Sequence, residues 1–299
     1  MSLGFKLMEW AMRGAARLPM GVLYAFSYAG YLLLRYVARY RLRTVRVNLA
    51  ASFPDKSRRE LRRIERGFYR HFADNAVESV KMLHISADEM RRRMRFENVE
   101  LIDRLFGEGH DIVAYFSHCG NWEWATSVAL NTHTRSGSEA DYGFVYRPLK
   151  DKLFDAMMLE IRTRFGASAY PKATVFRELI RLRRSGKRFI TGFMSDQKPS
   201  HNDPTVVTMF LNRPTAFISG TETLARRMGL AAIYWDMEKT ARGHYRITCR
   251  LLDDGTHAGE PGTLTRNYAA MLQDTITRNP AIWLWTHKRW KIPVTMPAQ

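Results

Sequence analysis

Residues 111–130, DIVAYFSHCGNWEWATSVAL, combine groups that could do acid–base chemistry. A histidine, His118, follows an apolar run, and a carboxylate, Glu123, comes five positions later. A histidine that donates from one ring nitrogen to a carboxylate has a fixed tautomer, so its other nitrogen can take a proton from a hydroxyl group. The carboxylate also stabilises the imidazolium that forms. The pair therefore suggests a general base, provided that the chain brings the two side chains together.

The local pattern predicts how the two groups are placed. Residues 111–117 are apolar and rich in β-formers, which predicts a buried strand. Gly120 permits a sharp turn, and Asn121 is a good N-cap for a helix over 121–131, so Glu123 falls in the first helical turn. Both side chains would then lie at the carboxyl edge of a sheet, where open α/β folds bind their ligands. A histidine that only caps the strand end is the alternative.

The same spacing occurs a second time, between His84 and Glu89 in LHISADEM. Because the chain has nine histidines, such a match also arises by chance. His84 ends a stretch with helical apolar spacing, and Ser86 is a good N-cap for the next helix. We therefore predict a helix–turn–helix corner there, with a solvated Glu89.

Composition and charge limit the classes of protein. A chain of 299 residues, 45% of them hydrophobic, can bury a large core. Cys119 and Cys249 lie far apart and without CxxC spacing, so they predict neither a disulfide framework nor a metal site, which fits a reducing compartment. The net charge of +18 indicates an anionic partner: nucleic acid, a phospholipid surface, or an acidic protein or cofactor.

An uncharged apolar segment covers residues 18–34, with a cluster of arginines directly after it. As a helix these 17 residues would span about 26 Å, short of a hydrocarbon core of about 30 Å. Its Pro, Gly and Tyr residues favour an interfacial or shallowly inserted anchor over a full span. We therefore expect an N-terminal apolar membrane-associating helix with a basic flank in residues 1–46. A buried core helix is the alternative, and the absence of a small-residue cleavage site disfavours a signal peptide.

Residues 47–299 are expected to form one α/β domain, with a helical lead-in over 47–106. Strands and helices then alternate, which predicts a mostly parallel central sheet flanked by helices. The predicted strands are 111–117, 142–147, 188–194, 230–236 and 244–252. The predicted helices are 57–83, 87–106, 121–131, 152–165, 173–185, 216–228 and 263–278.

Two more predicted strands end in polar residues. Arg147 ends one of them, and Asp196 and Gln197 end another. Because the carboxyl ends of parallel strands meet at one edge of a sheet, these side chains should lie near His118. Each residue alone is typical of a surface turn, but together they form a candidate site.

An ordered series of motifs runs along nearly the whole chain: RTVRVNLAASFP, HFADNAVES, SHCGNWEWA, VYRPLKDKLFD, SDQKP, FLNRPTAFISGTETLARRMG and NPAIWLWTHKRWK. This series resembles the lipid A biosynthesis acyltransferase family. These are the late, or secondary, acyltransferases within the wider lysophospholipid and glycerolipid acyltransferase superfamily.

The resemblance implies a membrane enzyme on the cytoplasmic face of the inner membrane. It would transfer a fatty acyl chain from an acyl thioester, on acyl carrier protein or coenzyme A, to a hydroxyl of a lipid A precursor. No other cofactor and no metal are implied. His118 matches the general base of the family and Glu123 its carboxylate partner.

The resemblance also implies roles for other residues. Arg147, Asp196 and Gln197 match positions that hold the polar substrate or the site, and Asn121 is expected beside them as a substrate-binding residue. An acyl thioester is already activated, so the lipid hydroxyl can attack it directly. Backbone N–H groups near Gly120 and Asn121 are candidates for stabilising the oxyanion.

Several alternatives remain open at the level of sequence. Cys119 could act as a nucleophile that forms an acyl-enzyme. The acceptor could be a lysophospholipid or an aminolipid. Outside the enzymes, a basic membrane-surface or nucleic-acid-binding protein would share the charge. Against nucleic acid, the arginines are spread along the chain, no recognised binding motif is present, and the apolar N-terminal segment would have no purpose.

Overall fold

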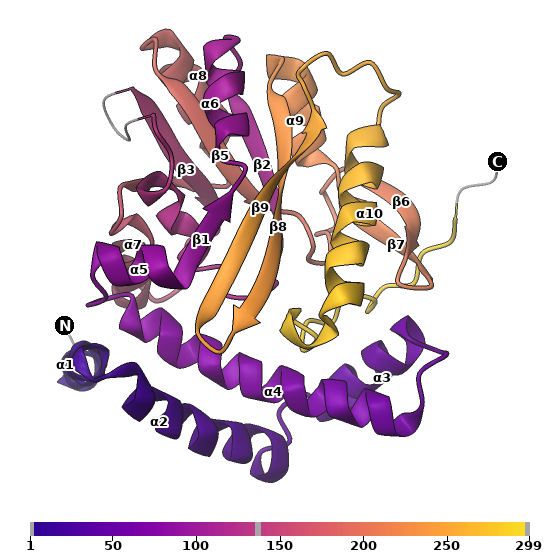
Figure 1. Ribbon diagram of the computed structural model, residues 1–299. Coiled ribbons are helices and arrows are strands. Elements are labelled where there is room, and N and C mark those ends of the chain that lie inside the picture. The colour runs from indigo at the N-terminus through magenta and orange to yellow at the C-terminus, as the bar shows by residue number, and fades with distance from the viewer. Residues whose placement is uncertain (1–2, 135–138, 297–299) are drawn as a thin grey trace.

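A seven-stranded sheet forms the centre of the computed structural model, which describes residues 3–134 and 139–296 (Figure 1). The strand order is β1-β9-β8-β2-β5-β3-β4. In chain order the strands are β1 (Met94–Glu97), β2 (Ile112–Phe116), β3 (Ala140–Tyr146), β4 (Ala167–Pro171), β5 (Arg188–Met194), β8 (Ala231–Ala241) and β9 (His244–Asp253). Every residue of β2 is buried, as expected for a central strand of a sheet covered on both faces.

Most neighbouring strands of the sheet are parallel. Strand β2 runs parallel to β5 and β8, and β3 runs parallel to β4 and β5, whereas β8 and β9 form an antiparallel pair. The register places Phe116 of β2 opposite Met194 of β5. The predicted mostly parallel α/β sheet is therefore confirmed. The segments that follow β2, β3 and β5 leave the sheet at the same edge.

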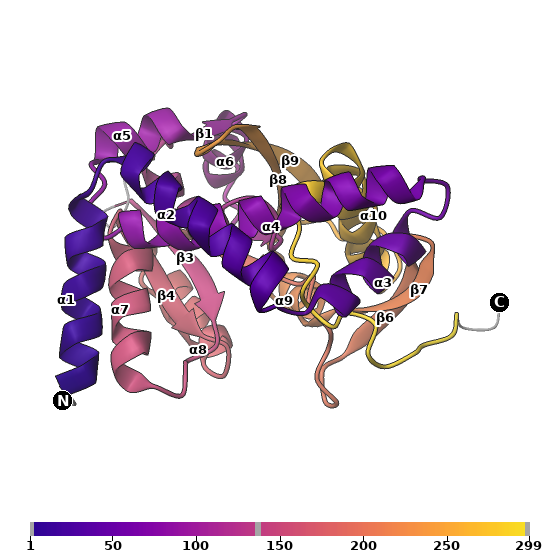
Figure 2. The same ribbon diagram turned by 90° about the horizontal axis from the view of Figure 1, so that it is seen from below.

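Helices flank this sheet and also close its lower end in Figure 1. The α-helices beyond the N-terminal segment are α3 (Leu42–Ser52), α4 (Arg58–Lys81), α5 (Ala87–Arg93), α6 (Glu100–Gly107), α7 (Lys152–Thr163), α8 (Val175–Arg184), α9 (Gly220–Met228) and α10 (Thr263–Arg278). Two short 3₁₀ helices are η2 (Trp124–Leu130) and η3 (Pro280–Ile282). Figure 2, seen from below, shows α4 running beneath the sheet.

Helix α4 begins with a capping box. The Glu60 N–H donates to the Ser57 hydroxyl at 3.3 Å, and the Ser57 N–H donates to the Glu60 carboxylate at 2.8 Å. Its buried face is unusual because it contains many polar groups: Glu65, His71, Asp74, Asn75, Glu78 and Lys81. Buried polar groups need hydrogen-bond partners. This face of α4 can therefore hold the loops at the sheet edge through hydrogen bonds.

The apolar segment 18–34 forms α2 (Met20–Leu32) and part of a π-helix, η1 (Leu33–Val37), after α1 (Leu3–Arg17). One face of α2 is buried, and the helix packs on α4. The segment therefore agrees in part with the alternative interpretation, which was a buried core helix. Its other face exposes large apolar side chains, among them Phe26 at 61% and Leu33 at 55%. Within the described part of the chain, no helix is long and apolar enough to cross a membrane.

Three predicted helices differ in the structure. Residues 87–106 form α5, β1 and α6, because β1 pairs with β9, far away in the chain. Residues 216–228 begin as the end of β7 (Arg213–Ile218), which pairs with β6 (Thr205–Phe210) in a separate hairpin, and only then form α9. The helix predicted over 121–131 is instead the 3₁₀ helix η2 over Trp124–Leu130, in which Thr and Ser hydroxyls bond to carbonyls three residues earlier. Neither the β6–β7 hairpin nor strand β4 was predicted from the sequence.

Candidate active site

His118 lies two residues after the end of β2, and its ring is held by Asp196, two residues after the end of β5. The His118 Nδ1 lies 2.7 Å from Asp196 Oδ1, and the His118 backbone N–H donates to Asp196 Oδ2 at 3.0 Å. The parallel register explains this meeting, since each residue comes two positions after the paired Phe116 and Met194. The prediction that these strand ends converge is confirmed for His118 and Asp196.

The Asp196 carboxylate is buried and accepts a third hydrogen bond, from the Trp283 indole N–H at 2.9 Å. Burial raises the pKa of Asp196, but the charge and hydrogen bonds of His118, together with the Trp283 N–H, outweigh this effect. The net result is a pKa of about 2. Asp196 is therefore an anion at neutral pH and accepts a hydrogen bond from His118 Nδ1.

The other ring nitrogen of His118 faces Gln197. Since Asp196 can only accept, Nδ1 carries the proton in neutral His118, and Nε2 keeps a lone pair. The Gln197 Nε2 lies 3.0 Å from His118 Nε2, so its amide donates to that lone pair. The Trp122 ring also contacts the imidazole edge-on, with the ring centroids 5.2 Å apart. His118 is thus oriented with its basic nitrogen directed away from Asp196.

Glu123 is not the partner of His118. Both of its carboxylate oxygens bind the guanidinium of Arg162 on α7, at 2.6 and 2.7 Å. Among the described residues, no hydrogen bond or ion pair joins Glu123 to His118. The predicted His118–Glu123 pair is therefore corrected to His118–Asp196. The turn at Gly120 causes the difference, because it sends the chain away from β2 before Glu123 is reached.

We expect Glu123→Gln to act mainly on stability, because it leaves the Arg162 guanidinium charged, with a side chain only 18% exposed, and without its carboxylate. The loss should be about 3 kcal/mol in the free energy of unfolding, measured by chemical denaturation. The double variant Glu123→Gln with Arg162→Gln removes both charges and should recover most of that stability and most of the activity. A double variant that folds normally but stays inactive would show that the Glu123 charge takes part in the chemistry.

Asn121 and Gly120 have structural roles. The Asn121 side-chain NH₂ donates to Glu78 at 2.9 Å, and its side-chain carbonyl accepts from the Trp124 N–H at 3.2 Å. Because Asn121 is buried and both ends of its amide are bonded, the predicted role in binding substrate is replaced by a structural one. The Gly120 N–H donates to the carbonyl of Ile282 at 3.0 Å, so it is not free to stabilise an oxyanion.

Gly120 itself cannot be replaced without strain. Its φ of +58° lies in the left-handed region, and a Cβ there would lie 2.6 Å from Met237 Cγ. The turn at this glycine separates His118 from η2.

Arg147 and Cys119 are not part of the His118–Asp196 arrangement. Arg147 follows β3 at the same edge of the sheet, but it is exposed and, within the described chain, has no hydrogen bond to His118 or Asp196. Cys119 is fully buried, and burial raises the pKa of its thiol. A thiol that stays protonated and inaccessible is a poor nucleophile. The structure therefore disfavours the acyl-enzyme on Cys119.

The C-terminal segment contributes residues whose role the sequence did not assign. Besides the Trp283–Asp196 bond, the His287 Nε2 accepts the backbone N–H of Lys198 at 2.9 Å, next to Gln197. Burial lowers the pKa of His287 to about 4, so it is neutral and able to accept. The Asn48 amide of α3 holds this segment by donating to the carbonyls of Trp285 and His287. The motif WLWTHKR was the feature of the sequence that could have indicated these residues.

A histidine oriented by a buried carboxylate, at the carboxyl edge of an α/β sheet, is typical of enzyme sites in which a general base takes a proton from a hydroxyl group. The family model described as bacterial lipid A biosynthesis acyltransferase matches residues 4–292, nearly the whole chain. The chain therefore belongs to the bacterial lipid A biosynthesis acyltransferase family, as its motifs predicted, which supports an enzyme that transfers acyl groups. A search of the curated proteins found no match.

Proposed function

We propose that this protein is a membrane-associated O-acyltransferase that moves a fatty acyl chain from an acyl thioester to a hydroxyl group of a lipid A precursor. The observation that carries the proposal is the His118–Asp196 pair, with its basic nitrogen directed away from the carboxylate, in a chain of this family. An acyl thioester needs only an activated hydroxyl for transfer, and a positioned histidine supplies that activation.

In the proposed reaction, His118 Nε2 takes the proton of the lipid hydroxyl while the hydroxyl oxygen attacks the thioester carbonyl. The negative charge of Asp196 stabilises the imidazolium that forms. When the tetrahedral intermediate collapses, the carbon–sulfur bond breaks and the imidazolium returns the proton to the leaving thiolate. The substrate hydroxyl takes the place on Nε2 that the Gln197 amide holds, so Gln197 marks where the acceptor oxygen binds.

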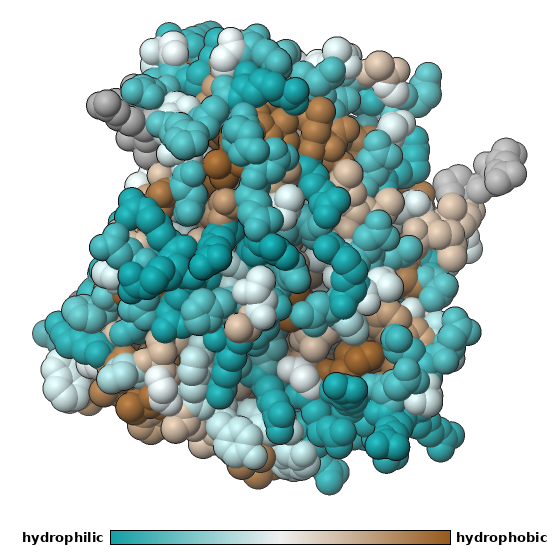
Figure 3. Space-filling view, in the orientation of Figure 1, coloured by the Kyte–Doolittle hydropathy of each residue, from teal (hydrophilic) through white to brown (hydrophobic). Residues whose placement is uncertain are grey.

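The surface around α1, α2 and η1 supports membrane association. Twelve of the exposed large apolar residues lie there, in the turn that follows η1 and in the middle of α3: Leu7, Met8, Trp10, Val22, Phe26, Tyr28, Leu32, Leu33, Tyr36, Val37, Tyr40 and Val47. White and brown side chains gather along the lower border of Figure 3, where α1 and α2 run in Figure 1. An exposed apolar surface of this kind beside arginines favours an interface with an anionic bilayer on the cytoplasmic side.

The double variant Phe26→Ser with Leu33→Ser should weaken binding to anionic phospholipid vesicles by about tenfold or more, because each side chain would otherwise bury apolar surface in the bilayer. Sedimentation with vesicles measures this binding. The matched control, Met209→Ser with Ile292→Ser, removes equally exposed apolar groups elsewhere, at 52% and 60% exposure, and should bind normally. Equal binding by both double variants would contradict an N-terminal membrane surface.

The donor and the acceptor are tested by reconstitution of the full-length protein in neutral detergent. Acyl transfer to a lipid A precursor should appear with an acyl thioester of acyl carrier protein or of coenzyme A. The net charge of +18 favours both donors, since both are acidic. Transfer only to lysophospholipid or aminolipid would replace the proposed acceptor. No transfer to any lipid hydroxyl with either donor would overturn the proposed function.

A further inference from the structure

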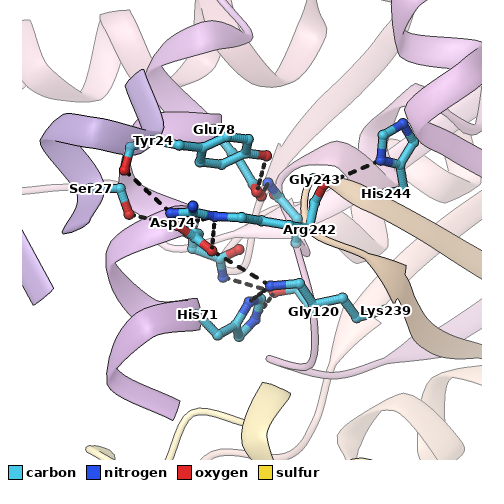
Figure 4. A network of polar contacts seen from close by, with 12 residues as sticks. Tyr24, Ser27, His71, Asp74, Glu78, Gly120, Lys239, Arg242, Gly243 and His244 are labelled. Carbon is cyan, nitrogen blue, oxygen red and sulfur yellow. Dashed lines mark hydrogen bonds and ion pairs between the residues drawn. The ribbon is translucent and has the colours of Figure 1, made fainter. Parts of the chain in front are cut away.

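A second polar site lies between α2, α4 and the turn that joins β8 to β9. It is a cavity of about 420 Å³. Helix α2 contributes Ser27, Tyr28 and Tyr31, and α4 contributes residues including Arg70 and His71. Figure 4 shows the polar contacts at this place, with Lys239 and Arg242 approaching α4 from the β8–β9 hairpin.

The cavity walls carry more positive than negative charge. Three cationic side chains, Arg70, Lys239 and Arg242, line the cavity together with one carboxylate, Asp74. Asp74 is already used: it accepts from Arg242 at 2.7 Å and from the Ser27 hydroxyl at 2.6 Å, and Lys239 lies 3.7 Å away. Glu78, which does not line the cavity, also interacts electrostatically with Lys239 and Arg242. Two carboxylates still cannot neutralise three cations, so the cavity keeps an excess of positive charge.

Arg70 is the cation with the least compensation. Its guanidinium lies over the Tyr31 ring, 5.3 Å from the centroid, and in the described part of the chain it has no carboxylate partner. A guanidinium can offer paired N–H groups to a phosphate. The hydroxyl groups of Ser27, Tyr28 and Tyr31 add uncharged polar groups to the same walls.

His71 connects this cavity to the candidate active site. It is buried, and burial together with the Lys239 charge lowers its pKa to about 3, so it is neutral. Its Nδ1 accepts from the Lys239 ammonium at 3.3 Å, which leaves Nε2 to donate to the Gly120 carbonyl at 3.2 Å. Gly120 comes two residues after His118. His71 therefore links a wall of the cavity to the His118 loop.

We propose that this cavity binds a phosphate group carried by a membrane lipid. Its cations suit a phosphate mono- or diester, and its position beside the exposed apolar face of α2 would let acyl chains stay in the bilayer while the phosphate enters. Tyr28 belongs both to the cavity wall and to the exposed face of α2, since it lines the cavity and is 49% exposed. The identification of this lipid as the acyl acceptor rests on the proposed function, whereas the binding itself does not.

Calorimetric titration of the full-length protein in neutral detergent tests the site with two probes, dihexanoyl phosphatidic acid and inorganic phosphate. The short-chain lipid should bind more tightly than inorganic phosphate. Arg70→Gln should weaken lipid binding by about tenfold, the loss expected for one charge-assisted contact. Because Arg70 is exposed and leaves no carboxylate unpaired, this variant should fold, and circular dichroism checks it.

Arg63→Gln is the matched control. Arg63 lies two turns earlier on α4, is exposed, and does not line the cavity, so this variant makes the same charge change without touching the site. Equal weakening by both variants would reduce the effect to net charge and overturn the proposal. Equal affinity for inorganic phosphate and the lipid would overturn the lipid assignment, and no binding of either at millimolar concentration would overturn the site.

None of these outcomes depends on acyl transfer. Selective loss of lipid binding in Arg70→Gln, in a protein that transfers no acyl chain, would support the cavity and contradict the proposed function. Normal acyl transfer by a protein that binds no phosphate would support the proposed function and contradict the cavity proposal.

Discussion

His118→Ala is expected to lower the rate of acyl transfer by about 10²- to 10⁴-fold, the range that a positioned general base contributes. The reason is that Nε2 of His118 is the nitrogen that Asp196 leaves free to take the proton of the lipid hydroxyl. The side chain lies at the edge of the sheet and is partly accessible, so its removal should leave the fold intact. The measurement is single-turnover transfer at saturating donor, with folding followed by circular dichroism.

The control for this prediction is His84→Ala with Glu89→Gln, the second pair with the same spacing. The structure places His84 in an exposed turn, and Ser86 caps the following helix by accepting the Glu89 N–H at 3.2 Å, as the sequence predicted. This double variant should turn over at a nearly normal rate. Loss of activity in the control, together with an active His118→Ala, would mean that the wrong histidine was chosen.

Asp196→Asn is expected to have nearly as large an effect, up to about 10⁴-fold, although the size of the side chain hardly changes. One carboxylate oxygen accepts from His118 Nδ1, while the other accepts two donors, the His118 backbone N–H and the Trp283 indole. The NH₂ group of an asparagine cannot face two donors. It should therefore turn towards His118 Nδ1, which forces the ring proton onto Nε2.

The tautomer that results cannot act as a base through Nε2. Nitrogen NMR of protein labelled at histidine should show His118 protonated at Nδ1 in the wild type and at Nε2 in Asp196→Asn. His118 resonances are assigned by their absence in His118→Ala. An unchanged tautomer together with lost activity would limit the role of Asp196 to its charge.

The sequence predicted the sheet edge well because strands such as β2, β3 and β5 are recognisable from short apolar runs. A parallel arrangement requires their carboxyl ends to meet, and this requirement alone predicts that His118, Asp196 and Gln197 lie close together. What a single sequence lacks is strand register. The pairing of Phe116 with Met194 decides that Asp196 contacts His118.

The other differences have the same non-local origin. Strand β1 was predicted as helix because its four residues, MRFE, alternate between apolar and polar over too short a run to stand out from the helical spacing of residues 87–106. Its pairing with β9, far away in the chain, makes these residues extended. Trp283 lies 87 residues from Asp196, so no spacing argument could connect them. Conversely, Glu123 was close in sequence to His118 and was assigned to it for that reason, whereas its partner Arg162 lies on α7.

The most direct test of the account compares single-turnover acyl transfer by two folded variants: Asp196→Asn, and Glu123→Gln combined with Arg162→Gln. The account predicts that the first loses at least about 10²-fold in rate, whereas the second stays within about tenfold of the wild type because it removes an ion pair whose neutral replacement is tolerated. The opposite result, a nearly normal Asp196→Asn and an inactive but folded double variant, would show that Glu123 and not Asp196 is the carboxylate on which His118 depends.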